Sequence, residues 1–307
     1  MDDLHALPKF RDSMTHLYVE RARVDREEKA LAIWDEHGMT PVPAASLCVL
    51  MLGPGTTITQ AAVAACCDNN CLLIWCGEQN VRFYACGTGA TRSAARLIHQ
   101  ARLASDEALR WEVVRRMYCR RFREEIGPEV SIEQMRGKEG YRVREAYARF
   151  SRETGVPWTG RSYERNRWQG ADPINRALSA ANACLYGLCH AAILSAGYSP
   201  ALGFIHTGKQ LSFVYDIADL YKLDVTVPAA FQVTAEGEQE LERRVRICLR
   251  DYFRREKLVG RIIPDIQEIL ADETPPEELG AYDEDAARPA DLWTPSFAPE
   301  EKDAEEQ

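Results

Sequence analysis

The hydrophobic pattern of the chain changes abruptly at residues 87–91, just after a run of short strand-like segments. Before Gly87-Thr88-Gly89, brief apolar and β-branched runs are separated by Gly and Pro, as in strands joined by turns. After it, long charged and Ala-rich stretches repeat their apolar residues at the spacing of amphipathic helices. The sequence therefore predicts an α+β fold, with an N-terminal β-strand domain followed by a larger all-α domain.

The boundaries of this organisation follow from where each pattern begins and ends. We expect a β domain at residues 1–87, a helical catalytic domain at 91–271 and an acidic tail at 272–307. The expected strands are 17–24, 30–34, 47–52, 71–76 and 81–85, with one helix at 58–67 among them. The expected helices of the second domain are 93–125, 132–153, 174–196, 212–222 and 238–270.

The charge of the chain is distributed unevenly. The net charge of −9 comes from 38 basic and 47 acidic residues, but residues 272–307 hold 13 of the acidic ones against Arg288 and Lys302. The first 271 residues carry 36 basic and 34 acidic residues, and residues 92–168 carry 18 and 11. The acidic average therefore conceals a basic segment suited to DNA phosphates. The tail is expected to be disordered, because its composition buries too little apolar surface to offset ordering.

Several classes of protein are disfavoured at once. No run of about 18 uninterrupted apolar residues occurs, and Met1-Asp2-Asp3 lacks the features of a secretion signal. We therefore expect a cytoplasmic protein with no membrane partner. Four of the ten cysteines, Cys66, Cys67, Cys71 and Cys76, lie close together, but no paired C-x-x-C motifs occur. Buried thiols are a better interpretation than a zinc site.

The segment 203–224 carries the residues best suited to chemistry. His206-Thr207-Gly208-Lys209 reads as a loop before an amphipathic helix on which Asp216 and Asp219, three residues apart, share one face. Two carboxylates beside an apolar stripe need a compensating positive charge, and a divalent cation would supply it. An ordinary solvated pair of aspartates, with His206 as a loop histidine, explains the segment equally simply.

A second unusual segment is Arg136-Gly137-Lys138-Glu139-Gly140, which lies inside a helical pattern. Two glycines within a helix cost about 1 kcal/mol each relative to alanine, so they suggest that a backbone or a ligand comes close. Glu139, with arginines around it, could be a third metal ligand beside phosphate-binding groups. The alternative is a kinked surface helix with ordinary ion pairs.

Together these segments make the chain resemble a known family, the CRISPR-associated integrase/endonuclease of the spacer-adaptation module, in its subtype I-E-like form. The resemblance covers about residues 14–270. It is carried by Arg136-Gly-Lys-Glu-Gly140, by the run 203–219, by Leu52-Gly-Pro-Gly-Thr56 and by Leu185-Tyr-Gly187. The fold of that family is also a β domain joined to a larger helical domain.

The resemblance implies a metal-dependent enzyme that transfers phosphoryl groups of DNA. It places Mg²⁺ or Mn²⁺ on Glu139, His206 and Asp219, makes Asp216 an auxiliary acid or occasional ligand, and sets Tyr186 near the site, where it would position DNA. A 3′-hydroxyl of incoming DNA would attack the repeat phosphodiester, and water in its place would give a nuclease. Tyr186 could equally be a buried residue of its Ala-rich helix.

The resemblance also implies a set of partners. The chain would form a homodimer, and two homodimers would clamp a dimer of a small adaptation protein into a heterohexamer. Its DNA partners would be double-stranded prespacer DNA with single-stranded ends and CRISPR repeat DNA. The expected DNA contacts are Arg82, Arg136, Arg144, Tyr163, Trp168, Lys209 and Tyr215. Tyr163 and Trp168 alternate with arginines, a pattern suited to stacking unpaired bases, although a polar interhelical loop would look similar.

Three other functions compete with this interpretation. In a tyrosine recombinase, His206 and Tyr215 would be catalytic, but the neighbouring Asp216 and Asp219 do not suit that mechanism. In an isoprenoid synthase, Asp216 and Asp219 would bind a diphosphate through metal ions, but a second aspartate-rich motif is missing. A DNA-binding scaffold without chemistry of its own is the alternative outside enzymes.

Overall fold

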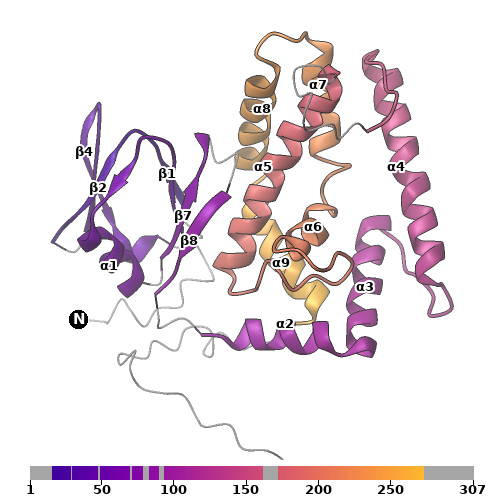
Figure 1. Ribbon diagram of the computed structural model, residues 1–307, viewed down its shortest axis with the longest axis horizontal. Helices are drawn as coiled ribbons and strands as arrows, with labels where there is room; N and C mark the ends of the chain where they lie inside the picture. The colour runs from indigo at the N-terminus through magenta and orange to yellow at the C-terminus, as the bar shows by residue number, and fades with distance from the viewer. Residues whose placement is uncertain are drawn as a thin grey trace, which may run out of the picture.

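The structure is a computed structural model that describes residues 16–28, 30–47, 49–69, 71–78, 83–89, 93–161 and 172–272. In these residues the strands end at Gly87, and the long helices begin at Ala95. Figure 1 shows the strands gathered on one side of the molecule and α2–α9 on the other, with α4 farthest from the strands. The predicted α+β class is confirmed.

The N-terminal region contains two four-stranded sheets. One has the order β1 (His16–Val19), β5 (Val49–Leu52), β7 (Leu72–Cys76) and β8 (Phe83–Gly87), with only β8 antiparallel to its neighbour. The other has the order β4 (Gly38–Pro43), β3 (Ala30–Asp35), β2 (Arg23–Glu27) and β6 (Thr57–Ile58). A short 3₁₀ turn, η1 (Ala44–Ser46), and one helix, α1 (Gln60–Asp68), complete it.

The continuous apolar runs of β5 and β7 are explained by burial on both faces. Leu50 and Leu73 point into a core shared with the second sheet and α1. Met51 and Ile74 point the opposite way and pack with Ala191 of helix α5 (Pro173–Ser195). The sheet is thus the layer that joins the β region to the helices, and the stacking of Phe83 on His190, at 3.6 Å between ring centroids, lies at this junction.

The clustered cysteines divide between the two faces of the same sheet. Cys66 and Cys71 belong to the core on the β side, and Cys76 lies on the face toward α5. Burial of these three thiols is as predicted, whereas Cys67 is only half-buried. Burial raises the pKa of Cys76 to about 12, so this thiol stays protonated at neutral pH.

The strand predictions fail where tertiary contacts turn the chain. The expected strand 17–24 is two strands, because Arg21 adopts a left-handed conformation, with φ of 50°, and donates its N–H to the carbonyl of Pro54 at 2.9 Å. The turn sends β1 and β2 into different sheets. Strand β4 was not predicted because it contains Pro41 and Pro43, which an edge strand tolerates.

Eight helices follow in the described residues. Besides α5 they are α2 (Ala95–Ser105), α3 (Glu107–Phe122), α4 (Ile132–Thr154), α6 (Ser212–Ala218), α7 (Thr226–Ala235), α8 (Leu241–Arg255) and α9 (Leu258–Leu270). Helix α5 is their centre and contacts α6, α7, α8 and α9. Its length and composition alone would allow it to cross a membrane, but 72% of its most apolar window is buried by the rest of the protein. It is therefore a core helix.

Three predicted helices differ from the structure in where they end or break. Asp106 ends α2 and caps α3 by accepting the Leu109 N–H at 2.9 Å, so the expected helix 93–125 is two helices. Lys257, with φ of 47°, likewise separates α8 from α9. Helix α6 ends at Ala218 instead of 222, and α7 was not predicted.

The last described residue is anchored in the helical core. Asp272, expected to begin the tail, is buried; its carboxylate lies 3.0 Å from Nε of Arg96 and accepts a hydrogen bond from the Tyr198 hydroxyl. The His99 ring contacts the Leu270 carbonyl at 3.0 Å, so α2 also holds the end of α9. The acidic segment therefore leaves the described structure from a fixed point. Residues 273–307 lie outside the described residues.

We predict that Asp272→Ala lowers the free energy of unfolding by about 3 kcal/mol, because it leaves the Arg96 guanidinium buried without its carboxylate. Denaturant unfolding of the full chain measures the change. Asp251→Ala is the matched control, since Asp251 is exposed and pairs only locally with Arg250; its effect should stay within about 0.5 kcal/mol. Equal losses in the two variants would show that the buried pair contributes no special stability.

Candidate active site

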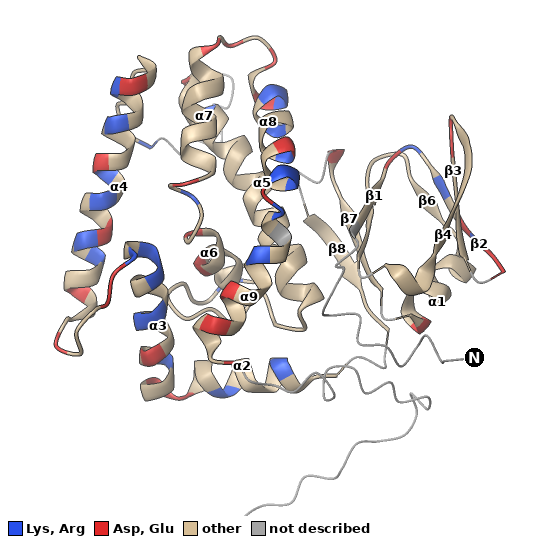
Figure 2. Cartoon of the chain, turned by 180° about the vertical axis from the view of Figure 1, so that it is seen from behind, with Lys and Arg blue, Asp and Glu red and all other residues tan. Residues whose placement is uncertain are grey.

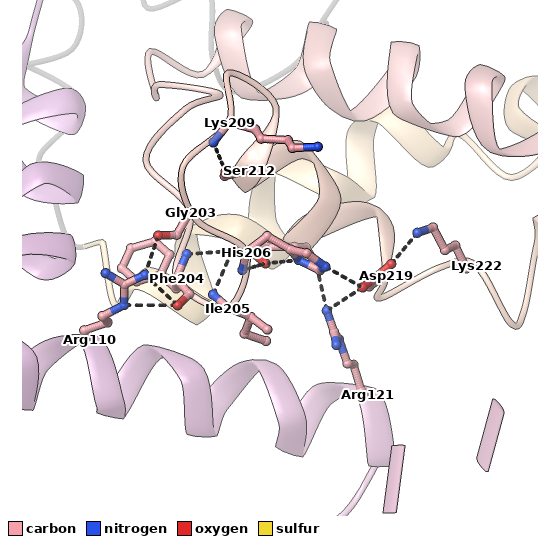
Figure 3. Close-up of polar contacts among 11 residues, drawn as sticks. Arg110, Arg121, Gly203, Phe204, Ile205, His206, Lys209, Ser212, Asp219 and Lys222 are labelled. Atoms are coloured by element: carbon pink, nitrogen blue, oxygen red, sulfur yellow. Dashed lines mark hydrogen bonds and ion pairs between the residues drawn. The ribbon is translucent and has the colours of Figure 1, made fainter. Parts of the chain in front are cut away.

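The loop that carries His206 is held tightly by helix α3. A side chain at Gly203 would bring its Cβ within 2.3 Å of the His206 carbonyl oxygen, so only glycine fits there. Arg110 of α3 donates to the carbonyls of Gly203 and Phe204 at 3.0 and 2.8 Å. Figure 3 shows this guanidinium beneath the loop, which turns back on itself before α6. The position of His206 is thus determined by the backbone of its own loop.

The centre of the loop is the carboxylate of Asp216, which has no solvent exposure. Its Oδ2 accepts the N–H groups of Phe204 and Ile205 at 2.6 and 3.1 Å. Its Oδ1 accepts the His206 N–H at 2.9 Å and contacts ring atom Nδ1 at 2.7 Å. Four bonds use the full acceptor capacity of an ionised carboxylate. Asp216 is therefore occupied in positioning the loop and the His206 ring, and its expected role as an auxiliary acid or occasional ligand stays a prediction.

The bond to Asp216 also decides the tautomer of His206. Because an ionised carboxylate only accepts, a neutral His206 ring has its proton on Nδ1 and its lone pair on Nε2. Nε2 lies 4.0 Å from Oδ2 of Asp219, and the ring is partly exposed. A carboxylate that orients a histidine in this way is the usual second partner of a metal-binding imidazole.

Asp219 has two further partners, both cationic. Arg121 of α3, whose side chain is 97% buried, donates from Nη2 to Asp219 Oδ2 at 3.2 Å and to the Asp216 carbonyl at 3.3 Å. Lys222 Nζ lies 2.6 Å from Asp219 Oδ1. In Figure 3 Arg121 approaches Asp219 from α3 below, Lys222 from the right, and His206 lies on the side opposite Lys222. Asp219 is thus the one acid of its helix that faces other charged groups.

Glu139, on α4, faces the same region through Tyr118. The pKa of Tyr118 is raised chiefly by burial, while the charges of Arg121, Glu139, Arg136 and Asp219 also act on it. The Arg121 guanidinium stacks over its ring at 5.4 Å. Oε2 of Glu139 is buried and has no hydrogen-bond partner among the described residues; the nearest cation, Arg142, is 3.7 Å away. A buried carboxylate oxygen that accepts no hydrogen bond is what an incoming cation would satisfy.

The three predicted metal ligands are therefore brought to one region but are not gathered into a closed set. Among the described residues no group of three or more His, Cys, Asp and Glu side chains is placed to hold a metal ion. Their chemistry nevertheless fits a hard divalent cation, because they offer an imidazole lone pair on His206 and carboxylate oxygens on Asp219 and Glu139.

Two tyrosines line the other side of Asp219. The rings of Tyr186 and Tyr215 meet edge to face at 5.1 Å, and Tyr215 meets His206 at 5.8 Å. Burial raises the pKa of Tyr186, so its hydroxyl stays protonated at neutral pH. Burial lowers the pKa of Lys222, but the charge of Asp219 and the contact with Tyr186 outweigh it, and the net shift is upward. Lys222 is therefore a permanent cation beside Asp219.

The predicted DNA contacts fall into two groups. Arg136 and Arg144 on α4 and Lys209 in the loop are exposed, and Tyr215 is half-buried. Arg82, Tyr163 and Trp168 lie outside the described residues. Gly137 faces open space and Gly140 makes only an ordinary contact, so packing within the described chain does not require either glycine.

Sequence reasoning missed the cations that hold the site together. Lys222 follows Asp219 by three residues, and this spacing is a usable signal for an ion pair. Arg110 and Arg121 carried no such signal, because they reach residues more than 90 positions away.

Comparison with known proteins identifies a family. The family model described as CRISPR associated protein Cas1 matches residues 16–126 and 117–258. The CRISPR-associated endonuclease Cas1 2 of Thermus thermophilus is 56% identical over 291 residues, 95% of this chain and 90% of the relative. The CRISPR-associated endonuclease Cas1 of Geobacter sulfurreducens is 48% identical over 262 residues, 85% and 86% of the two chains. The crystal structure of the TtCas1-DNA complex is similar with a TM-score of 0.78 and 56% identity, and covers 87% of this chain and all of the other.

We predict that Asp216→Ala lowers the free energy of unfolding by about 3 kcal/mol or more, because three backbone N–H groups and the His206 ring lose a buried charged acceptor. Denaturant unfolding measures the loss, and faster proteolysis within residues 203–209 would locate it. Asp224→Ala is the control, since Asp224 is exposed and pairs only with the exposed Arg123. A variant that unfolds like wild type would show that the loop does not depend on this carboxylate.

Proposed function

The chain belongs to the Cas1 family of CRISPR-associated proteins, and from this premise we propose that it is a metal-dependent DNA integrase and endonuclease. It inserts spacer DNA into a CRISPR array by transesterification, and it cleaves DNA with the same site when water is the nucleophile. The observation that carries the proposal is the arrangement around α6, in which buried Asp216 holds His206 beside Asp219.

A divalent cation, Mg²⁺ or Mn²⁺, would be held by His206 Nε2, Asp219 and Glu139. When bound it would polarise the phosphate and stabilise the charge on the attacking and leaving oxygens. Asp216 would keep the ring of His206 in the tautomer with its lone pair on Nε2. The cation would also contact Oε2 of Glu139, which has no hydrogen-bond partner among the described residues.

No residue of the protein needs to form a covalent bond to DNA. One phosphodiester bond breaks as another forms, and the attacking oxygen belongs to the incoming 3′-end. Tyr186, protonated at neutral pH, is suited to donate a hydrogen bond, and Tyr215 to contact a sugar or base beside the reacting phosphate. Lys222 and Arg121 would add positive charge near the same phosphate.

DNA would approach along the exposed cations of α4 and of the His206 loop. Arg136, Arg144 and Lys209 are exposed and offer contacts to phosphates of prespacer and repeat DNA. Figure 2 shows basic positions, in blue, spaced along α4, the helix that also carries Glu139. Arg82, Tyr163 and Trp168 stay predictions as further contacts.

Family membership excludes the tyrosine recombinase and the isoprenoid synthase. The remaining alternative is a DNA-binding scaffold without chemistry of its own. The two functions are separable, because a scaffold would bind DNA equally well whether or not the residues around α6 are intact.

We predict that His206→Ala and Asp219→Ala each reduce metal-dependent strand transfer at least a hundredfold, because each removes a proposed ligand of the cation, while DNA affinity changes less than threefold. Strand transfer of a labelled prespacer into a repeat-containing duplex, with and without Mg²⁺, measures the first quantity. Salt-controlled binding of the same DNA measures the second.

The control for this experiment is Asp224→Ala, which removes an exposed carboxylate from the same segment. It should retain full activity. Normal strand transfer by either site variant would contradict the assignment of ligands, whereas wild-type protein that binds DNA without any strand transfer or cleavage would favour the scaffold.

The proposed assembly is a heterohexamer in the cytoplasm, in which two homodimers of this chain clamp one dimer of a small adaptation protein. The acidic segment after Asp272 is the proposed docking element for the small partner, because it starts from the anchored end of α9 and holds 12 acidic residues against only Arg288 and Lys302.

We therefore predict that deletion of residues 273–307 weakens assembly with the small partner about tenfold or more, and leaves or raises non-specific DNA binding. Analytical ultracentrifugation of the mixed proteins measures assembly. Retaining Asp272 in the truncated chain preserves the buried pair with Arg96, so a loss of stability would not obscure the result. If assembly is as strong without residues 273–307, the tail is not the docking element and serves only to keep the protein soluble.

A further inference from the structure

The acids of the active site are already matched by cations of the protein itself. The three carboxylates are those of Glu139, Asp216 and Asp219. Three permanently charged groups lie against two of them: Arg142 at 3.7 Å from Glu139, and Arg121 and Lys222 at 3.2 and 2.6 Å from Asp219. With His206 neutral, these six charges sum to zero. The site is therefore charge-balanced without any ligand.

We infer that the site binds a divalent cation weakly by itself and tightly only together with a DNA phosphate, and that Arg121 sets this dependence. The inference rests on the proposed function and concerns the regulation of the same site. A divalent cation added to a balanced set leaves it with two excess positive charges. A DNA phosphodiester bound beside the cation adds a negative charge, which offsets part of this excess.

The geometry identifies Arg121 as the main source of the effect. It shares Oδ2 of Asp219 with His206 Nε2, so it approaches the same oxygen that the cation would use. A ligand oxygen lies about 2.1 Å from Mg²⁺, which would bring the guanidinium and the cation within roughly 5 Å. Such a pair repels strongly where water is scarce, and the Arg121 side chain is 97% buried.

Arg121 also cannot move away easily. It is fixed by the Asp216 carbonyl at 3.3 Å and by the ring of Tyr118 at 5.4 Å. Its Nε is buried and has no hydrogen-bond partner among the described residues. A guanidinium with an unused donor beside the proposed reacting phosphate is suited to bind that phosphate once it arrives. Cation and DNA would then strengthen one another's binding by the same factor.

Binding of Mn²⁺, measured by electron paramagnetic resonance, tests the inference without relying on activity. The titration uses the full chain alone and with a branched DNA duplex that lacks a 3′-hydroxyl, after subtraction of Mn²⁺ bound by the DNA alone. For wild-type protein we expect the DNA to lower the Kd for Mn²⁺ at least tenfold. For Arg121→Met we expect the Kd without DNA to fall at least tenfold, and the effect of DNA to shrink below threefold.

Lys222→Met provides a second variant should Arg121→Met fail to fold, and it should change both quantities in the same direction. Arg123→Met is the matched control: Arg123 lies two residues after Arg121 at the end of α3, is exposed and pairs with Asp224, so both values should equal those of wild type.

Two contrary results have different meanings. Folded variants at positions 121 and 222 with the Mn²⁺ affinity of wild type, alone and with DNA, would overturn the inference while leaving the proposed function intact. Wild-type protein that binds no Mn²⁺ in either condition would contradict the proposed function itself, and the inference with it.

Discussion

The arrangement of the active site depends on one buried carboxylate. Asp216 gathers the backbone N–H groups of residues 204–206 and the ring of His206 around a single side chain. A buried charge is tolerated only when its hydrogen bonds are complete, so the loop and the helix beneath it must fold together. Gly203 and Arg110 satisfy the remaining geometric and polar requirements of that loop. The direction in which His206 points is thus a consequence of how Asp216 is satisfied.

Two aspartates one helical turn apart consequently serve different purposes. Asp216 lies on the side of α6 that enters the core, where only backbone N–H groups and an imidazole are close enough to pair with it. Asp219, at the end of the helix, faces Arg121 and Lys222. The spacing predicted that Asp216 and Asp219 share a face, but it did not predict that they have different partners. It depends on the loop at residues 199–211 and on α3, both of which reach α6 only in the folded chain.

The same distinction separates what the sequence predicted well elsewhere from what it did not. Helices α4 and α5 begin within a residue of their predicted positions because their start signals are local: Ser131 and Gln134 form a capping box, and Pro173 occupies the first turn. The breaks at Arg21, Asp106 and Lys257 were missed, because one left-handed or capping residue inside a continuous apolar pattern leaves the periodicity almost unchanged. Glu139, His206 and Asp219 were predicted as ligands from motifs, and that assignment stays a prediction. The contact of Arg121 with Asp219, 98 residues away, carries no such motif and is recognisable only in the structure.

The placement of the arginines also changes how the basic segment 92–168 should be understood. Its excess of basic residues favoured a DNA-facing surface, yet six of its arginines form hydrogen bonds or ion pairs within the protein. Buried carboxylates or backbone carbonyls accept from Arg96, Arg110, Arg115, Arg116, Arg120 and Arg121. Five of these residues connect α2 and α3 to other parts of the helical region: Arg96 and Arg110 to the segment after α5, Arg121 to α6, and Arg116 and Arg120 to α9. Arg136 and Arg144 of α4 are exposed, as are Arg102 and Arg123, and Figure 2 marks the basic positions along α4. Local net charge therefore overstates the surface offered to DNA. Arg110 and Arg121 instead hold the His206 loop and Asp219, so the positive charge beside Asp219 is fixed by the folded core.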